Sequence, residues 1–329
     1  GRMHLKPPQF WSAEPGTSRL SKALAPLGAV YHAAVQRRIA TTEPVSVGVP
    51  VICAGNATMG GVGKTPFVRA ICFMLSAVGR TPHVLTRGYG GQLKGPVAVN
   101  PEHSAAEVGD EPLLLARDHP VWISRERVPG AAAAAKAGAD VIVMDDGLQN
   151  PSLAKDFSFL LVDAPTLFGN GAVFPAGPLR ERPEAARSRS QAVVAVLPDG
   201  CTEVPRTLKR FARGIELIEA WFVLDEAAMP EGPLLAFCGI GRPERFFRAL
   251  LGAGADLVDA VPFADHHPYA PDDLAFLHER AQRLGATLVT TEKDLVRLAP
   301  SERHGITAIP GRMDVRDEAR LLRLLTEVL

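Results

Sequence analysis

A glycine-rich turn near residue 60 constrains the fold of this 329-residue chain more than any other feature. A strand-like apolar run covers 49–53, the turn ends in Gly63-Lys64-Thr65, and apolar residues then recur at helical spacing over 66–75. In such a loop the backbone N–H groups surround a polyphosphate, the lysine reaches the outer phosphates and the threonine hydroxyl can bind Mg²⁺. The order of strand, turn and helix predicts that the chain binds a nucleoside triphosphate.

The loop departs from the strict phosphate-loop pattern at one position, because Thr58 stands where that pattern has a glycine. The alternative interpretation is a glycine-rich connection that holds no ligand. The sequence context favours phosphate binding, since the strand, the turn, the Lys-Thr pair and the helix all occur in order. The residues expected to hold the phosphates are Thr58, Gly60, Gly61, Val62, Gly63, Lys64 and Thr65.

Composition indicates a globular protein with substantial cores, since 47% of the residues are hydrophobic and 22% are charged. Basic and acidic residues number 36 each, so the formal net charge is zero and no global field favours nucleic acid. The four cysteines show neither a C-x-x-C pair nor zinc-site spacing, which predicts buried free thiols. No apolar run reaches the ~18 residues of a membrane-spanning helix, and no motif calls for a protein partner.

Apolar, β-rich runs alternate with helical stretches after the loop, for example at 83–86, 141–144 and 192–196. Such alternation predicts an α/β fold with a P-loop NTPase-like, doubly wound, mainly parallel sheet. A polar, arginine- and proline-containing stretch interrupts this rhythm before a second set of runs begins. The expected domains are a phosphate-loop kinase domain over 45–205, a linker over 206–229 and a smaller α/β domain over 230–329 that closes an active-site cleft.

The N-terminal segment, 1–44, has the pattern of an amphipathic helix with basic residues near its ends. Its apolar residues recur at spacings of three and four at Leu20, Leu24, Leu27, Tyr31 and Val35. Pro26 is expected to kink this helix or to start a second one. Two interpretations are open: the helix packs on the neighbouring domain, or its apolar face enters a membrane interface together with Phe10 and Trp11.

Acidic residues stand where an α/β sheet places its chemistry, at the carboxyl ends of strands. Asp145 and Asp146 follow the run 141–144, as in a Walker B strand, and their carboxylates would bind Mg²⁺ beside the phosphates. The alternative is a solvated acidic turn. On its own, Asp110-Glu111 is no more than a helix-start signal, and Asp265-His266-His267 is no more than a structural carboxylate–histidine pair.

Taken together, several segments resemble the motifs of the tetraacyldisaccharide 4′-kinase family. They occur in the family's order over nearly the whole chain, at 55–66, 86–91, 109–112, 145–149, 175–181, 265–266 and 291–294. Members of that family phosphorylate the 4′-hydroxyl of a lipid A precursor. The resemblance accounts for Thr58, because the family has a small hydroxyl residue there. One departure is Asn150, where the family carries histidine, so no role is transferred to this position.

The resemblance implies an ATP-dependent kinase that acts with Mg²⁺ on a tetraacylated glucosamine disaccharide 1-phosphate. Lys64 would hold the ATP phosphates, and Asp110 paired with His266 would take the proton from the sugar hydroxyl. His267 is the alternative imidazole. The implied Mg²⁺ ligands are Thr65, Glu111, Asp145 and Asp146.

Further residues are implied to contact the two substrates. Glu292 and Asp294, which follow an expected strand, would contact the nucleotide base, with an ordinary strand-end loop as the alternative. The phosphate already present on the acceptor would be bound by Arg87, Arg127 and Arg180, for which a surface role is the equal alternative.

An acylated disaccharide stays in a membrane, so the resemblance also favours interfacial docking of the N-terminal helix. The expected location is peripheral, on the cytoplasmic face of the inner membrane. Two rival functions remain at this point. One is a ParA- or MinD-like membrane-associated ATPase switch, although Met59 stands where such switches carry a lysine. The other is a non-enzymatic nucleotide-binding module, or a GTPase that selects its base through 291–294.

Overall fold

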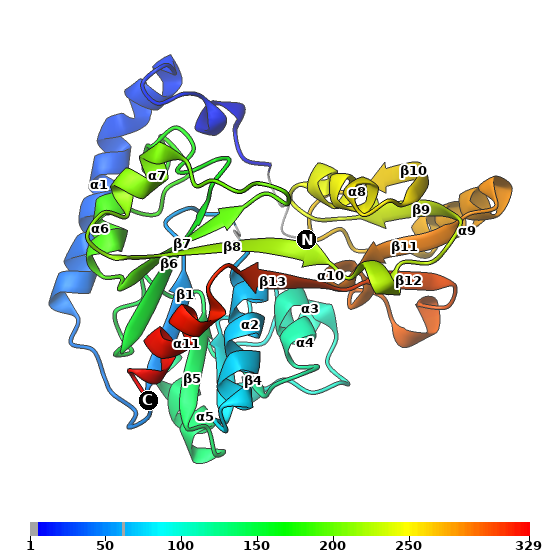
Figure 1. The fold of residues 1–329 in the computed structure, drawn as a ribbon. Coiled ribbons are helices and arrows are strands. Elements are labelled where there is room, and N and C mark those ends of the chain that lie inside the picture. The colour runs from blue at the N-terminus through cyan, green and yellow to red at the C-terminus, as the bar shows by residue number, and fades with distance from the viewer. Residues whose placement is uncertain (1–5, 61–62) are drawn as a thin grey trace.

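The computed structural model describes residues 6–60 and 63–329, which form two α/β domains (Figure 1). The larger domain contains a nine-stranded sheet in the order β13-β8-β7-β6-β1-β5-β2-β4-β3. Its strands pair in parallel except for the edge strands β3 and β13, which are antiparallel to β4 and β8. The strands are β1 (Val51–Gly55), β2 (Pro82–Thr86), β3 (Val97–Ala98), β4 (Val121–Ile123), β5 (Val141–Asp145), β6 (Phe157–Asp163), β7 (Ala192–Leu197), β8 (Glu216–Leu224) and β13 (Gly311–Val315).

Helices cover both faces of this sheet, so its central strands are buried on both sides and read as continuous apolar runs. One core joins α2 (Lys64–Ala77) and α11 (Glu318–Thr326) to the sheet. The opposite core joins α5 (Arg127–Lys136), α6 (Pro183–Ser188) and α7 (Arg206–Phe211) to it. The short helices α3 (Ala105–Val108) and α4 (Asp110–Leu115) precede β4.

The smaller domain is a four-stranded parallel sheet in the order β10-β9-β11-β12. Its elements, in chain order, are β9 (Pro233–Cys238), α8 (Pro243–Gly252), β10 (Asp256–Pro262), α9 (Pro271–Leu284), β11 (Thr287–Thr291), α10 (Glu292–Leu295), the 3₁₀ turn η3 (Pro300–Glu302) and β12 (Ile306–Ile309). Phe237, Leu277 and Leu288 lie in its core between the sheet and α9.

The division of the chain differs from the expected one at two places. The stretch 206–229 is not a linker, because it forms α7, β8 and the 3₁₀ turn η2 (Glu226–Ala228). The C-terminal 311–329 returns to the larger domain, where β13 pairs with β8 and α11 packs on α2. The smaller domain is therefore an insertion between two neighbouring antiparallel strands (Figure 1).

The N-terminal segment forms the 3₁₀ turn η1 (Gln9–Ser12) and one continuous helix, α1 (Arg19–Thr41), that keeps Pro26 inside it. Ser18 caps α1 through a hydrogen bond from Ser21 N–H to its hydroxyl. The helix lies along one side of the larger domain (Figure 1). At Gly28 it comes so close that an added Cβ would lie 2.6 Å from Val173 O, so only glycine fits there.

The described residues contain no helix long and apolar enough to cross a membrane. Cys53, Cys72 and Cys238 are buried free thiols, as the sequence predicts, whereas Cys201 is half-buried. Burial raises the pKa of Cys53 to about 12, so this thiol stays protonated and unreactive.

Candidate active site

The phosphate loop connects β1 to α2, as the sequence predicts. Gly63 caps α2 with φ at +59°, and a Cβ there would lie 2.9 Å from Met313 Cε of β13. Asn56, almost fully buried, braces the loop by donating hydrogen bonds to Thr58 Oγ1 (2.9 Å) and Gly60 O (2.6 Å). Two of the expected phosphate contacts, Gly61 and Val62, lie outside the described residues.

The loop side chains meet the carboxyl end of β5, the strand beside β1. Lys64 Nζ lies 3.0 Å from Asp146 Oδ2 and donates to Asn56 Oδ1 at 3.1 Å. Thr65 Oγ1 donates a 2.8 Å hydrogen bond to Asp145 Oδ2. Asp146 has a φ of +73°, which turns the chain sharply after the strand. The structure thus brings the predicted lysine, threonine and both aspartates into one cluster.

Burial and neighbouring charge affect the two aspartates differently. Burial raises the pKa of Asp145 to about 6, with the charges of Asp146 and Glu111 adding to the rise and that of Lys64 opposing it. Burial would also raise the pKa of Asp146, but Lys64 and Arg180 hold it far below its usual value. Hydroxyl and carboxylate oxygens are the ligands that Mg²⁺ prefers, and Thr65 and Asp145 place one of each 2.8 Å apart. This cluster therefore fits a divalent cation.

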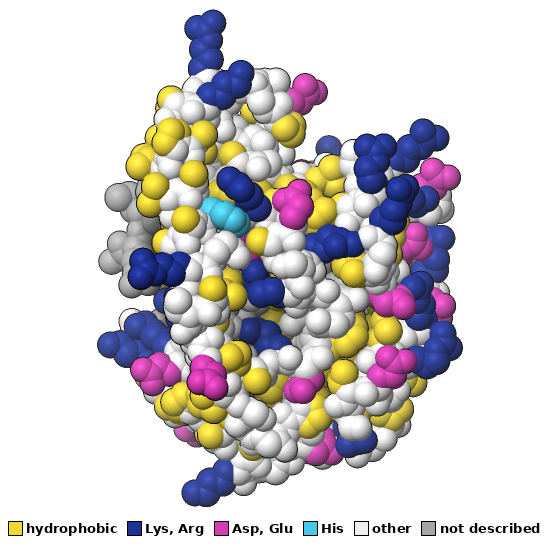
Figure 2. All heavy atoms as spheres, turned by 90° about the vertical axis from the view of Figure 1, so that its left-hand side faces the viewer, with side chains coloured by type: hydrophobic (Ala, Val, Ile, Leu, Met, Phe, Trp, Pro, Cys, Tyr) yellow, Lys and Arg dark blue, Asp and Glu magenta, His cyan; other side chains and the backbone are white. Residues whose placement is uncertain are grey.

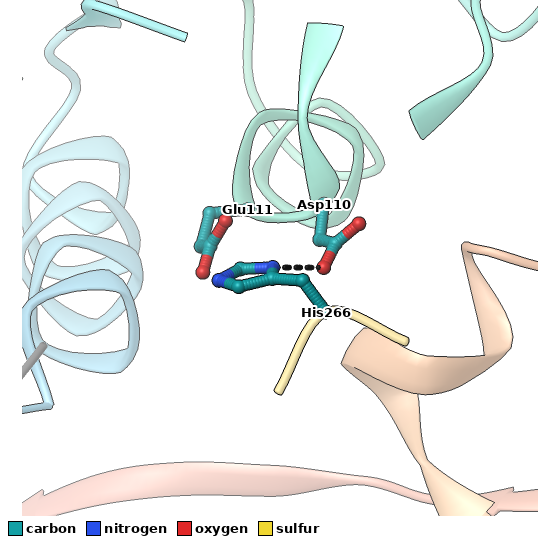
Figure 3. A group of neighbouring side chains, drawn as sticks. All are labelled: Asp110, Glu111 and His266. Carbon is teal, nitrogen blue, oxygen red and sulfur yellow. Dashed lines mark hydrogen bonds and ion pairs between the residues drawn. The ribbon is translucent and has the colours of Figure 1, made fainter. Parts of the chain in front are cut away.

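A second cluster lies where α4 begins. His266, from the loop after β10, places Nδ1 2.8 Å from Asp110 Oδ2, and the other oxygen of Asp110 points away from the ring (Figure 3). Glu111 is close to both, and one ligand atom from each of the three residues lies within 4.8 Å of the others. Burial would raise the pKa of Asp110, but the hydrogen bond from His266 and the charge of Arg297 hold it below its ordinary value.

The structure distinguishes the two neighbouring histidines. His266 has a φ of +56° and faces Asp110, whereas His267 Nε2 lies 2.9 Å from Asp273 Oδ2 within the smaller domain. The ring of His267 also stacks on Phe263, with centroids 4.8 Å apart. Only His266 is therefore placed to act with Asp110.

The residues expected to contact the nucleotide base have other partners. Asp294 is fully buried and accepts hydrogen bonds from Gly239 N–H (2.8 Å) and the Tyr269 hydroxyl (2.7 Å). Glu292 is nearly buried and pairs with Arg69 of α2 at 2.9 Å. Both carboxylates thus join protein elements together.

The three arginines predicted to bind the acceptor's phosphate lie in different environments. Arg180 enters the site, where its Nη1 lies 2.9 Å from Asp146 Oδ1. Arg87 is exposed after the carboxyl end of β2. Arg127 is 4% exposed and donates to the Ser124 carbonyl at 3.0 Å, and its Nε lies beside Gly147, the residue after Asp146. Of the three, Arg180 is the one that forms an ion pair with Asp146 among the described residues.

Sequence reasoning missed two cations that the smaller domain brings to the acidic pair. Lys293 Nζ lies 2.7 Å from Glu111 Oε1, and Arg297 Nε donates to Asp110 Oδ2 at 2.7 Å. Burial would raise the pKa of Glu111, but Lys293 holds it below its ordinary value. The only sequence signal was the position of Lys293 between two residues already singled out, 292 and 294.

Comparison with known proteins identifies relatives of this chain and of its fold. Residues 20–329 match the family described as tetraacyldisaccharide-1-P 4′-kinase. A tetraacyldisaccharide 4′-kinase of Caulobacter sp. (strain K31) is 48% identical, with 99% of each chain covered. One of Rhodospirillum centenum is 47% identical, with 99% of this chain and 97% of the relative covered. The crystal structure of "apo" form LpxK from Aquifex aeolicus in complex with ATP has a TM-score of 0.75 at 25% identity, covering 94% of this chain and 99% of that one.

Proposed function

Because the chain belongs to the tetraacyldisaccharide-1-P 4′-kinase family, we propose that its active site transfers the γ-phosphoryl group of ATP to the 4′-hydroxyl of a tetraacylated glucosamine disaccharide 1-phosphate, a lipid A precursor. One observation carries the assignment of the site. The Asp110–His266 pair, joined at 2.8 Å, lies beside Glu111. Burial raises the pKa of Asp145, the neighbour of the phosphate loop, and the charge of Glu111 adds to this rise. A proton acceptor and a polyphosphate site are thus adjacent.

The reaction forms a bond between the 4′-oxygen of the sugar and the γ-phosphorus. The bond from that phosphorus to the β–γ bridging oxygen breaks, and ADP leaves. The proton of the hydroxyl passes to the carboxylate–imidazole pair. An imidazole that donates through Nδ1 to Asp110 carries its acceptor lone pair on Nε2, and the second oxygen of Asp110 is a further acceptor.

The loop residues bind and orient the donor. Lys64 and the backbone amides of the loop would hold the β- and γ-phosphates, with Thr58, Gly60, Gly61, Val62, Gly63 and Thr65 around them. The residues that would hold Mg²⁺ are Thr65, Asp145, Asp146 and Glu111. Bound Mg²⁺ supplies neutralisation of the phosphate charge. Of the arginines predicted to bind the acceptor's phosphate, Arg180 is the one that pairs with Asp146 in this site.

Transfer of label from [γ-³²P]ATP tests this function. With the tetraacylated disaccharide 1-phosphate in mixed micelles, we expect one labelled lipid for each ADP formed. An acceptor that lacks the 4′-hydroxyl should give no labelled lipid and little ADP. ATP hydrolysis that needs vesicles but no disaccharide would instead support the membrane-associated ATPase switch.

We further propose that α1 docks on the membrane that contains the acceptor. Large apolar side chains on its outer face are exposed: Leu20 (53%), Leu27 (57%) and Val30 (67%). Figure 2, which faces the side of the molecule that α1 covers, shows hydrophobic side chains gathered on this face with Lys and Arg side chains nearby. The exposed basic residues of α1 are Arg19, Lys22, Arg37 and Arg38. Such a surface suits peripheral binding to anionic lipid, and ATP supply assigns it to the cytoplasmic face of the inner membrane.

The contacts of α1 revise which residues should enter the interface. The ring centroids of Tyr31 and Phe174 lie 5.3 Å apart. The Trp11 indole N–H donates a 3.2 Å hydrogen bond to Pro175 O. These aromatic residues therefore belong to the seam between α1 and the larger domain. The apolar stripe available to a membrane is the one formed by Leu20, Leu27 and Val30.

Vesicle binding tests the docking proposal. Replacing Leu20, Leu27 and Val30 with serine should weaken sedimentation with vesicles of 30 mol% phosphatidylglycerol at least tenfold, and should slow turnover of vesicle-embedded acceptor. The matched control replaces three exposed apolar residues of the smaller domain, Leu251, Val258 and Phe276, with serine. Equal binding by both triple variants would refute the assignment to α1.

A further inference from the structure

One buried carboxylate of the smaller domain connects to both members of the Asp110–His266 pair. Asp294 is 0% exposed, and its Oδ1 accepts hydrogen bonds from Arg297 Nη1 at 2.9 Å and from Gly239 N–H at 2.8 Å. The Thr291 and Tyr269 hydroxyls also donate to it, so this carboxylate is fixed by four different residues. Asp294 is therefore a rigid point inside the smaller domain.

The first connection runs through Arg297 to the carboxylate. Arg297 has a side chain that is 4% exposed, and its Nε donates to Asp110 Oδ2 at 2.7 Å. The same oxygen is the one that lies 2.8 Å from His266 Nδ1. Two donors from the smaller domain thus bind one oxygen of Asp110 and leave the other oxygen facing away from them (Figure 3).

The second connection runs through Gly239 to the imidazole. The Gly239 carbonyl accepts a 3.0 Å hydrogen bond from the backbone N–H of His266, the residue with φ at +56°. A Cβ at Gly239 would lie 2.9 Å from Arg297 Nη1 and 2.8 Å from Ala264 O. Glycine is thus needed here for Arg297 and the turn to come together, and the turn holds His266 in its strained conformation.

We propose that Asp294 and Arg297 form a positioning unit that sets the Asp110–His266 pair for phosphoryl transfer. This inference rests on the proposed function. Through Arg297, the fixed position of Asp294 in the smaller domain determines where the Asp110 carboxylate of the larger domain lies. The Asp110–His266 pair is then complete only when the two domains are together.

The division of donors within Arg297 supports this role over simple neutralisation of Asp294. A guanidinium that served only Asp294 would bind it with two parallel donors. Arg297 instead donates to Asp110 through Nε and to Asp294 through Nη1. Its buried Nη2 has no hydrogen-bond partner in the described part of the chain. The side chain spans the two carboxylates rather than closing on one.

A double-mutant cycle on kcat tests the proposal, with Arg297→Gln measured in the wild-type and Asp110→Asn backgrounds at saturating ATP and acceptor. In the wild-type background we expect a fall of about 10- to 100-fold, because a small misplacement of a reacting group has that effect. In the Asp110→Asn background the further fall in kcat should be under about threefold, since position 110 then carries no ionised carboxylate for Arg297 to position. The KM for ATP should change little in either case.

Arg245→Gln is the matched control, because Arg245 is also a smaller-domain arginine that binds a buried carboxylate of the larger domain, Asp163. It should keep kcat within about threefold. Arg297→Lys keeps the charge and should recover part of the lost turnover. Gly239→Ala, which crowds Arg297, should also lower kcat. This variant tests the proposal if Arg297→Gln does not fold.

The outcomes separate the inference from the function on which it rests. If Arg297→Gln lowered kcat equally in both backgrounds, or if Arg245→Gln lowered kcat as much as Arg297→Gln, the positioning role would be overturned. Absence of acceptor-dependent transfer by the wild-type protein would overturn the proposed function instead. Loss of turnover specific to the Asp110-containing background, measured at a temperature at which every variant is folded, is the result we expect.

Discussion

The choice between His266 and His267 is made by backbone conformation at a single residue. The left-handed φ of His266 costs a non-glycine residue of order 1 kcal/mol, and the hydrogen bond to Gly239 O holds it in place. That conformation directs one imidazole to Asp110 and the next to Asp273. A sequence pattern carries no information on a turn of this kind, so the sequence left both histidines open.

If Asp110 and His266 act as a unit, Asp110→Ala combined with His266→Ala should lower kcat little more than the worse single change. Multiplicative losses would mean that the two residues act separately. His267→Ala is the control, because its ring contacts Asp273 and Phe263 rather than Asp110. A loss of activity from His267→Ala as large as that from His266→Ala would contradict the assignment.

Lys64→Ala should lower kcat roughly 10³-fold or more, because positioning and charge stabilisation dominate phosphoryl transfer. The fold should survive, since Asp146 keeps Arg180 as a partner at 2.9 Å when Lys64 is lost. Single-turnover transfer from labelled ATP and a thermal melt measure the two effects. Near-normal transfer would show that the loop does not hold the phosphates as proposed.

At the scale of elements, α1 is tied to the phosphate loop through one buried glutamate. Glu181, which is 0% exposed, accepts hydrogen bonds from Gln36 of α1 and Gln149 at 2.9 Å each, and it pairs with Arg189. Gln149 also donates to the Asn56 carbonyl next to the loop. A position on α1 is therefore connected, through Glu181 and Gln149, to the residue that braces the phosphate loop.

Glu181→Ala should destabilise the protein by about 2 kcal/mol, less than for a fully buried pair because Arg189 remains 24% exposed. Gln36→Ala, which removes one uncharged donor from the same carboxylate, should cost about 1 kcal/mol. Urea unfolding of both variants measures the difference. Equal stabilities would mean that Arg189 finds a new partner when Glu181 is removed.

Much of the element pattern is predictable from the sequence, and the exceptions have physical causes. Buried central strands such as β1 and β5 are continuous apolar runs, so their positions follow directly. β8 was missed because its start is polar and most of its residues are only half-buried near the sheet edge. Apolar residues of α1 were assigned to one face, whereas the structure divides them, with Leu24 and Tyr31 inward and Leu20 and Leu27 outward.

At the scale of the whole molecule, several ionic contacts join the two domains, alongside the apolar contact that Leu224 of β8 makes with the core of the smaller domain. Asp163, at the end of β6, accepts hydrogen bonds from Arg242 and Arg245 of the smaller domain at 3.2 and 2.8 Å. Arg69 of α2 pairs with Glu292, and Arg297 with Asp110. Sequence reasoning could not foresee such pairs, because the partners are 79 to 223 residues apart in the chain.

The Asp163 contacts predict a pH dependence of stability. Burial would raise the pKa of Asp163, but the hydrogen bonds and charge of Arg245, with Thr166 and Arg242, hold it below its ordinary value. A carboxyl with a lowered folded-state pKa stabilises the fold above its unfolded pKa of about 4, and this contribution is lost as the pH falls through the folded value. Asp163→Asn should therefore lower stability at pH 7, with a smaller effect near pH 3.5.

Urea midpoints for wild type and Asp163→Asn between pH 7 and pH 3.5 check this expectation. Asp118→Asn is a control, since Asp118 also pairs with an arginine, Arg69, but within the larger domain and with 25% of its side chain exposed. A difference between wild type and Asp163→Asn that is constant with pH would show that the ionised carboxyl contributes no net stability.

The insertion of the smaller domain between β8 and β13 has a consequence for the order in which the protein matures on the ribosome. Met313 of β13 lies against the position of Gly63, and α11 covers α2, yet both are synthesised after every residue of the insertion. The helix that begins at Lys64 therefore emerges early and lacks the cover of β13 and α11 while some 230 later residues are translated. The nascent chain cannot complete the core around α2 until translation has passed the second domain, so premature termination there leaves the larger domain without β13 and α11.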